Sequence, residues 1–216
     1  DSLFIALPDG RLMLLDAGGF PSYSGRRSGI DTGEDIVSPY LWTRSIKRLD
    51  VVAVSHLHED HAGGVPSVLR NFRPKEVWTG PLPETPEALR LQEAVRATGA
   101  RLRIWNEGAR SDYGAVEIEA LAPPAGEGIP AGNGDRGSLV LRLRHGRRSF
   151  LLTGDMDPRI EQDLAERGRF AECDVLKVPH HGSRYSTREP MLSQAHPAFA
   201  LISVGALALA SMRARR

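Results

Sequence analysis

Side chains able to bind metal stand together in the run Ser55-His56-Leu57-His58-Glu59-Asp60-His61. Four apolar residues, Val51–Val54, precede it and are typical of a buried strand that ends in a polar loop. Alternate residues of an extended segment share a face, so His56 and His58 can bind one cation, and Asp60 and His61 can reach a second. Imidazole with carboxylate is the ligand set of catalytic zinc, iron or manganese sites, whereas structural zinc sites use thiolates. The alternative is an ordinary polar surface loop, in which three of the seven histidines would have gathered by chance.

Further candidate ligands follow predicted strands. Asp155 comes after an apolar run and Gly154, and its alternative role is to cap the helix that follows. His180 and His181 come after another apolar run and Pro179. Consecutive residues point apart, so we expect one ring to face a metal and the other a substrate or a supporting residue. The sequence leaves open which of the two does so.

Other polar residues have weaker signals. Asp16 ends a predicted strand and is expected to orient a ligand histidine, or else to stabilise a turn. Ser183, Ser186 and Thr187 offer hydroxyls for phosphate oxygens near a helix start; the alternative is that Ser186 or Thr187 caps that helix. His145 and His196 are expected at the surface.

The elements that position these residues are short strands and helices. The expected strands are Leu3–Leu7, Arg11–Asp16, Val51–Val54, Arg101–Trp105, Val116–Ala122, Ser138–Leu143, Ser149–Thr153, Val175–Val178 and Ala200–Val204, with two hairpins. The expected helices run from Ser38 toward Lys47, from Thr85 to Gly99, over Arg159–Glu166 and over Thr187–Gln194. Strands that alternate with helices predict mixed sheets covered by helices.

Composition limits the function classes. The 216 residues, 41% of them hydrophobic, suffice for one sizeable core. A net charge of +1 gives no global electrostatic argument for nucleic acid, so any DNA contact needs a local patch. Cys173 is the single cysteine and excludes an internal disulfide. No segment has the apolar length of a membrane span. The chain starts at Asp1 without a signal peptide, and we expect it to be part of a longer protein.

The pattern H-x-H-x-D-H after a strand resembles the signature of the metallo-β-lactamase superfamily. Four further segments resemble its ComEC-type competence branch, the membrane channel for DNA uptake; they are Leu15–Gly19, Gly33–Trp42, Leu152–Asp155 and Val178–Ser183. The resemblance implies an α/β (α+β) fold, an αββα sandwich of two mixed β-sheets flanked by helices, with two divalent ions (zinc or manganese) at one edge. It predicts one hydrolase domain over residues 1–205 and an atypical tail over 206–216.

The resemblance also implies that Asp155 bridges the two ions. The expected metal ligands are therefore His56, His58, Asp60, His61, Asp155 and His180. The expected catalytic residues are Asp60, Asp155 and His181, and the expected substrate-binding residues are Ser183, Asn133 and Ser138.

Two segments depart from the superfamily pattern. Where many relatives carry a further histidine, residues 132–138 have none, and Asn133 or Ser138 would contact a metal weakly or through water. That loss favours a harder ion such as manganese. The histidine-bearing ending usual in the competence branch is replaced by Ala206–Arg216, so we expect weak or no turnover from this chain as written.

Three functions follow from these observations. The first is a metal-dependent nuclease, and we expect its DNA substrate to be single-stranded. The resemblance implies that this nuclease lies beside the channel portion of a longer protein, on the extracytoplasmic side of the membrane. The second is a metallohydrolase of a small ester, thioester or lactone. The third is a catalytically impaired domain that binds DNA or a partner. The first is modestly favoured if the following basic residues line a track beside the site; the alternative is a solvated surface with scattered arginine. The residues are Arg26, Arg27, Arg44, Lys47, Arg48, Arg184 and Arg188.

Overall fold

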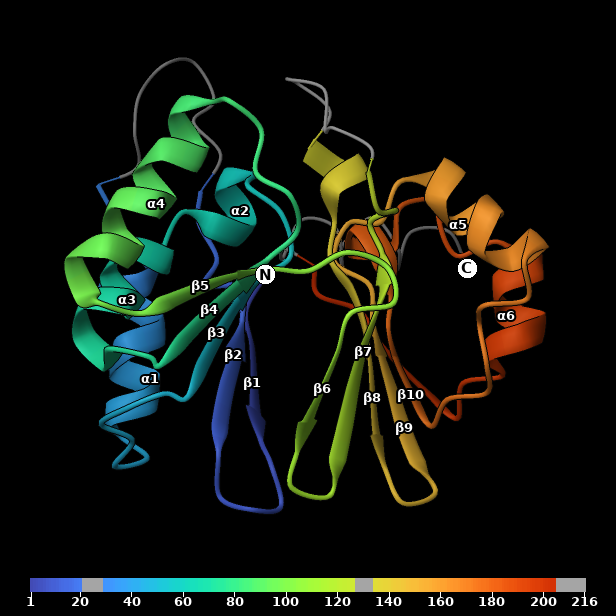
Figure 1. The fold of residues 1–216 in the computed structure, drawn as a ribbon, viewed down its shortest axis with the longest axis horizontal. Coiled ribbons are helices and arrows are strands. Elements are labelled where there is room, and N and C mark those ends of the chain that lie inside the picture. Colours follow the sequence, from blue (N-terminus) through green and yellow to red (C-terminus); the bar gives the residue numbers. More distant parts are fainter. Residues whose placement is uncertain (21–28, 127–133, 205–216) are drawn as a thin grey trace, which may run out of the picture.

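The computed structural model describes residues 1–20, 29–126 and 134–204. The chain forms two β-sheets packed face to face, and helices cover the outer face of each sheet (Figure 1). This is the αββα sandwich of two mixed sheets that the sequence predicted. Within the described ranges, no helix is long and apolar enough to cross a membrane.

The first sheet has five strands in the order β1-β2-β3-β4-β5. Its first two strands form an antiparallel hairpin, and all other neighbours are parallel. The strands are β1 (Leu3–Ala6), β2 (Leu12–Leu15), β3 (Val51–Val54), β4 (Glu76–Thr79) and β5 (Arg101–Ile104). The accompanying helices are a π-helical turn η2 (Gly33–Val37), α1 (Ser38–Trp42), α2 (Glu59–Ala62), α3 (Val65–Phe72) and α4 (Pro86–Thr98).

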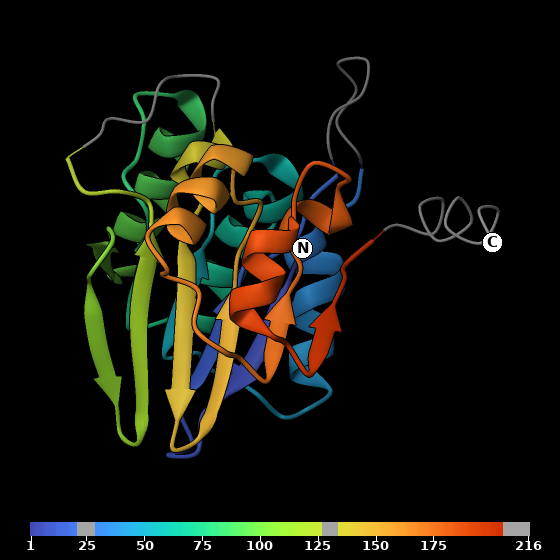
Figure 2. The same ribbon diagram turned by 90° about the vertical axis from the view of Figure 1, so that its right-hand side faces the viewer.

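The second sheet has six strands in the order β11-β10-β9-β8-β7-β6. The strands are β6 (Arg110–Tyr113), β7 (Val116–Ala122), β8 (Val140–His145), β9 (Arg148–Leu152), β10 (Val175–Lys177) and β11 (Phe199–Leu201). Strands β9, β10 and β11 are parallel, and the others pair antiparallel. Two α-helices, α5 (Pro158–Glu166) and α6 (Glu189–Ala195), lie side by side on its outer face (Figure 2). Two 3₁₀ turns, η3 (Gly134–Gly137) and η4 (Pro179–Gly182), belong to the connections.

The apolar core has three layers, and β3 shows how the sequence divides between them. Successive strand residues point to opposite faces of the sheet. Val51 and Ala53 therefore pack between the two sheets, whereas Val52 and Val54 pack against the helices. A third layer lies between the second sheet and helices α5 and α6. A parallel strand buried on both faces needs the continuous apolar run that was read from the sequence.

Most expected elements are present, and the differences have local causes. Both hairpins are confirmed, and α4 begins after Thr85, whose side chain accepts a hydrogen bond from the Ala88 amide. The helix expected to run from Ser38 toward Lys47 ends at Trp42, and the backbone at Ser45, three residues later, has a left-handed φ that prevents it from resuming. Strands β4 and β6 and helices α2 and α3 were missed. The apolar side chains of α3 recur at helical spacing, which would have sufficed to predict it.

Candidate metal centre

The predicted site residues gather at the edge of the sandwich where β2, β3, β9 and β10 end. Asp16 follows β2, the histidine-rich loop follows β3, Asp155 follows β9 and His181 follows β10. Ends of parallel strands meet at one edge of a sheet, where ligands commonly bind. Because β1 is antiparallel to β2, its start also lies at this edge, and the backbone oxygen of Asp1 accepts a hydrogen bond from the Gly18 amide at 2.6 Å.

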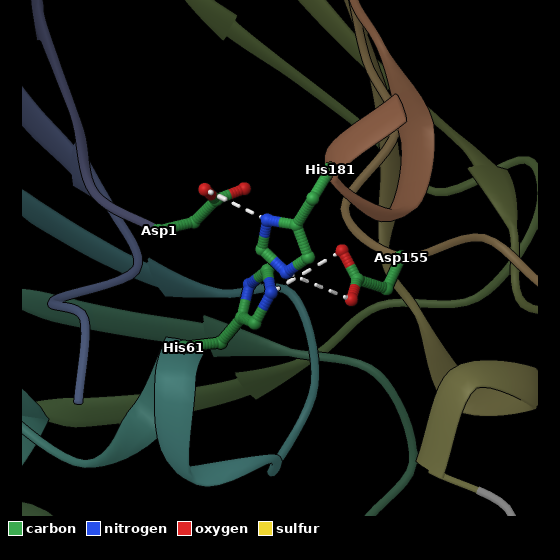
Figure 3. Close-up of side chains that lie close together, drawn as sticks. All are labelled: Asp1, His61, Asp155 and His181. Carbon is green, nitrogen blue, oxygen red and sulfur yellow. Dashed lines mark ion pairs between the residues drawn. The ribbon is translucent and has the colours of Figure 1, made fainter. Parts of the chain in front are cut away.

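Four residues form the centre of the site: Asp1, His61, Asp155 and His181. One ligand atom from each lies within 4.8 Å of the others (Figure 3). Oδ1 of Asp155 is 3.2 Å from Nε2 of His61, and Oδ2 is 3.4 Å from Nε2 of His181. Nδ1 of His181 is 3.4 Å from Oδ1 of Asp1. A carboxylate between two imidazoles is the position that a residue joining two cations would occupy.

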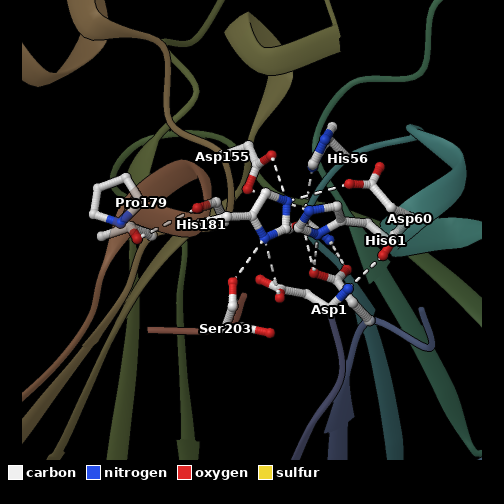
Figure 4. A network of polar contacts seen from close by, with 12 residues as sticks. Asp1, His56, Asp60, His61, Asp155, Pro179, His181 and Ser203 are labelled. Carbon is white, nitrogen blue, oxygen red and sulfur yellow. Dashed lines mark hydrogen bonds and ion pairs between the residues drawn. The ribbon is translucent and has the colours of Figure 1, made fainter. Parts of the chain in front are cut away.

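The other members of the H-x-H-x-D-H run surround this group. The ring centroid of His56 lies 4.6 Å from that of His58 and 4.2 Å from that of His61. Oδ2 of Asp60 lies 3.2 Å from Nε2 of His181, so the loop after β3 reaches the loop after β10 (Figure 4). His56 and His61 are buried and His58 is exposed. The structure therefore brings the whole predicted run to one place.

The structure separates the two consecutive histidines. Both have left-handed backbone angles, with φ of 48° and 53°. Their ring planes are nearly perpendicular, and the ring centroids are 6.2 Å apart. Nε2 of His181 faces Asp60 and Asp155, and its Nδ1 lies 3.1 Å from the Ser203 carbonyl oxygen, to which it donates when it carries a proton. His180 is not a member of the ligand group among the described residues. The geometry thus favours His181, and not His180, as the metal-binding histidine.

Asp16 contacts the candidate ligand His61 directly, as expected from the sequence. Its Oδ2 lies 2.8 Å from Nδ1 of His61, and its Oδ1 accepts the Ser55 amide at 2.7 Å. The residue is buried and has a left-handed φ of 60°, which turns its carboxylate under the histidine loop. It supports His61 from the side away from Asp155.

Charge in the site is arranged to favour cations. Hydrogen bonds to Asp155 and Asp60 raise the pKa of His181 to about 9. Burial opposes charge on His61, yet its close contacts with the carboxylates of Asp155 and Asp16 raise its pKa to about 9 as well. The same contacts hold the carboxyl pKa of Asp155 well below its usual range despite burial. Burial, and then the neighbouring His61, lower the pKa of His56 to about 4, so this ring is neutral near neutral pH.

Two buried side-chain atoms of the site support the binding of divalent metal ions. Among the described residues, Nε2 of His61 and Oδ1 of Asp155 are buried side-chain atoms without a hydrogen bond, and they point toward each other. Buried polar atoms are ordinarily hydrogen-bonded, so such a pair needs another partner. Imidazole nitrogens with carboxylate oxygens suit zinc, manganese or iron.

Asp1 and Lys177 were not predicted to belong to the site. Nζ of Lys177 lies 2.8 Å from Oδ2 of Asp1, and both side chains are largely buried. Burial lowers the pKa of Lys177. Asp1 had a usable signal, because pairing of the first hairpin places the start of β1 beside Asp16. Lys177 had none, since it stands inside an apolar strand.

The predicted substrate-binding residues have different positions. Ser138 is buried at the site edge, its hydroxyl has no hydrogen-bond partner among the described residues, and a side chain on Gly154 would lie 3.6 Å from it. Ser183 is half-buried in the loop after His181, and its hydroxyl accepts the Tyr185 amide at 3.3 Å. Asn133 lies outside the described residues, as does the tail 206–216.

The structure shows which residues cap helices α5 and α6, and how exposed the two remaining histidines are. Helix α5 is capped by Asp157 and not by Asp155. Neither Ser186 nor Thr187 caps α6; instead the buried carboxylate of Glu161 accepts the amides of Thr187 and Arg188 at 2.8 and 2.6 Å. His145 and His196 are exposed, as expected.

The structure divides the predicted basic track between two edges of the sandwich, so the prediction is wrong for Arg44, Lys47 and Arg48. Arg44, Lys47 and Arg48 directly precede β3, at the sheet edge opposite the one where β3 ends in the histidine loop. Arg184 and Arg188 lie exposed in the loop after His181, on the site side. Arg26 and Arg27 lie outside the described residues. Sequence order could not separate the two groups, because only the strand direction decides which edge a loop occupies.

The sequence of this chain is similar to those of known proteins. Residues 1–205 match the family model described as "Metallo-beta-lactamase superfamily". ComE operon protein 3 of Bacillus subtilis is 31% identical over 212 residues, covering 95% of this chain and 27% of that protein. Recombination protein 2 of Haemophilus influenzae is 30% identical over 201 residues, covering 93% of this chain and 22% of that protein. Competence protein ComA of Neisseria gonorrhoeae is 29% identical over 171 residues, covering 78% and 22%. The chain thus spans about a quarter of the length of these relatives.

Solved structures confirm the fold. A B3 metallo-beta-lactamase with an active-site glutamic acid aligns with a TM-score of 0.56 and 17% identity, covering 89% of this chain and 78% of that one. The MIM-2 metallo-beta-lactamase aligns with a TM-score of 0.55 and 19% identity, covering 83% and 69%. The sandwich fold and the similarity to ComEC-type competence proteins are both confirmed.

Proposed function

Because the chain belongs to the metallo-beta-lactamase superfamily of hydrolases, with competence proteins among its relatives, we propose that it is a metal-dependent phosphodiester hydrolase, a nuclease acting on DNA. The observation that carries the proposal is the convergence of Asp1, His61, Asp155 and His181, whose ligand atoms lie within 4.8 Å of one another. Buried nitrogen and oxygen ligands at one sheet edge suit hydrolysis assisted by two metal ions.

The ligands are assigned from their placement. His56 and His58 would hold one ion, Asp60 and His61 the other, and Asp155 both. His181 takes the ligand role first given to His180, because its Nε2 faces Asp60 and Asp155. The carboxylate of Asp1 adds a further oxygen, which supports manganese over zinc. Two bound divalent ions would supply Lewis-acid charge for phosphodiester hydrolysis.

The protein residues orient and balance this charge. Asp16 holds His61 through Nδ1, and the Ser203 carbonyl holds His181 through Nδ1, so both rings present Nε2 to Asp155. Fixing the other ring nitrogen by a hydrogen bond is how proteins set the tautomer of a ligand histidine. We assign Asp60, Asp155 and His181 to the catalytic group, and Ser183, Ser138 and Asn133 to contact with the substrate.

The loop after His181 supports a nucleic acid substrate. Arg184 and Arg188 are exposed there, and Tyr185 is 58% exposed. The guanidinium of Arg184 lies 4.6 Å from the Tyr185 ring centroid. Basic side chains bind phosphates and an exposed aromatic ring stacks on an unpaired base, which favours single-stranded DNA.

The wider setting is also a proposal, since the chain spans about a quarter of its relatives. We place the domain beside the membrane-channel portion of a longer competence protein, on the extracytoplasmic side, where it would cleave DNA during uptake.

A nuclease assay tests the proposal. Purified protein with manganese, magnesium or zinc is given end-labelled single- and double-stranded oligonucleotides, with metal content measured in parallel. We expect weak cleavage that is stronger with manganese than with zinc and is abolished by a chelator. A second chain carrying an Asn-Pro-Tyr-Gly-His-Pro ending in place of Ala206–Arg216 should cleave faster at equal metal occupancy.

Two outcomes would contradict the nuclease proposal. Hydrolysis of small esters, thioesters or lactones by both metal-loaded chains, without cleavage of DNA, would point to a small-molecule hydrolase. DNA binding without hydrolysis of any of these substrates would point to a binding domain.

A further inference from the structure

One hydroxyl group lies beneath the metal-binding loop and contacts two histidines of that loop and the carboxylate of Asp16. Ser55, the residue after β3, is fully buried. Its Oγ lies 2.7 Å from Oδ2 of Asp16, 3.0 Å from Nδ1 of His56 and 3.2 Å from Nδ1 of His61. No sequence signal marked this serine, because it reads as the end of an apolar strand.

The protons in this cluster can be placed by elimination. A serine hydroxyl donates one hydrogen bond, and a carboxylate only accepts. The 2.7 Å contact with Asp16 therefore takes the Ser55 proton. The same oxygen can then only accept from His56, which must carry its proton on Nδ1. Oδ2 of Asp16 likewise requires a proton on Nδ1 of His61, 2.8 Å away.

This pattern has a consequence for metal binding. A neutral imidazole with its proton on Nδ1 has its lone pair on Nε2. Nε2 of His61 is the atom that faces Asp155. We propose that Ser55 is a positioning residue that, through one hydroxyl shared by Asp16, His56 and His61, fixes the Nδ1–H tautomer of His56 and the orientation of both rings for metal binding. This inference rests on the proposed metal site and deepens it.

The surroundings of Ser55 hold the hydroxyl in place. Its amide donates to Oδ1 of Asp16 at 2.7 Å, and its carbonyl accepts the amide of Leu139, the residue directly before β8, at 2.8 Å. On its other side lies Gly154, with φ of 52°, where an added Cβ would stand 2.8 Å from the Ser55 Cβ. The backbone leading to Asp155 thus packs directly on Ser55. Both sheets contribute to the position of this one side chain.

The wild-type protein by itself provides a first test. Long-range proton–nitrogen NMR correlation spectra of metal-free protein at neutral pH report which ring nitrogen of His56 carries the proton. We expect the Nδ1–H tautomer. A His56 ring protonated at Nε2 would overturn the proposal without any variant, so failure of a variant to fold leaves the question decidable.

The second test compares Ser55→Ala with Ser67→Ala. Ser67 is a matched control, since it is buried and its hydroxyl donates to the carboxylate of Asp31 at 2.6 Å, away from the site. Zinc and manganese affinities are measured by calorimetry, and the His56 tautomer by NMR. We expect Ser55→Ala to weaken metal binding about 10–100-fold, the range for partners of ligand histidines. It should also lose the single Nδ1–H tautomer, whereas Ser67→Ala should change neither.

The proposal requires both changes in Ser55→Ala. An unchanged tautomer, or an affinity equal to that of wild type, would overturn it. If the wild-type protein binds no metal, the proposed function fails, and the tautomer comparison alone then decides whether Ser55 orients His56.

Discussion

Oδ1 of Asp155 lies 3.2 Å from Nε2 of His61, although the two residues follow strands of different sheets. The contact closes the site across the interface of the sandwich. Both atoms are buried, and neither has a hydrogen bond within the described part of the chain. Packing of the two sheets thus brings candidate metal ligands from both halves of the chain to one place.

Replacing the carboxylate that joins the two halves should remove metal binding. Substitution of a residue that hydrogen-bonds a metal ligand typically lowers metal affinity about 10–100-fold. We expect Asp155→Asn to lower the affinity by more than this and to abolish DNA hydrolysis, with the fold retained. Metal content after dialysis, circular dichroism and the oligonucleotide assay measure these effects. Asp157→Asn is the matched control, because asparagine caps a helix as well as aspartate does. A folded Asp155→Asn protein with full activity would contradict the assignment.

The two consecutive histidines should differ when each is truncated. His181→Ala removes the imidazole that faces Asp60 and Asp155, so we expect a loss of at least about 10-fold in metal affinity. His180→Ala leaves those contacts intact and should retain most of the affinity. Calorimetric titration of both variants with manganese and zinc makes the comparison. Equal losses, or a larger loss in His180→Ala, would return the ligand role to His180.

Stability of the metal-free protein should fall in mildly alkaline solution. Carboxylate contacts raise the pKa of His181 from 6.5 to about 9, and despite burial they do the same for His61. The folded state therefore binds these protons more tightly than the unfolded state, and the stabilisation is fully present below pH 6.5 and lost as pH rises through about 9. Bound metal should remove this dependence, because it replaces the protons. Thermal unfolding from pH 6 to about pH 9, with chelator and with manganese, measures both profiles; parallel profiles would contradict the prediction.

Charge removal should affect DNA binding only on the site side. We expect Arg184→Ala/Arg188→Ala to weaken binding of single-stranded DNA and to reduce its salt dependence, because each phosphate contact releases counterions. Arg44→Ala/Lys47→Ala removes the same charge at the opposite sheet edge and should bind as wild type does. Fluorescence anisotropy at several salt concentrations compares the two. A stronger effect from the second pair would place the DNA elsewhere.

Local features of this protein could be predicted from its sequence. The H-x-H-x-D-H loop, both hairpins and the capped helix α4 depend on neighbouring residues, so spacing and turn chemistry are sufficient to identify them. The superfamily could be inferred for the same reason, since its motifs are short and contiguous.

Tertiary structure decided the relationships between distant segments. Whether His180 or His181 faces the cluster depends on two left-handed residues after β10, and alternation of side chains predicts only that they diverge. The entry of Lys177 into the site, and the separation of the basic residues, depend on strand direction and sheet packing. The hydrogen bonds of Ser55 require three segments to meet within one hydroxyl's reach. Such contacts arise from the packing of elements far apart in the chain, which local residue patterns do not encode.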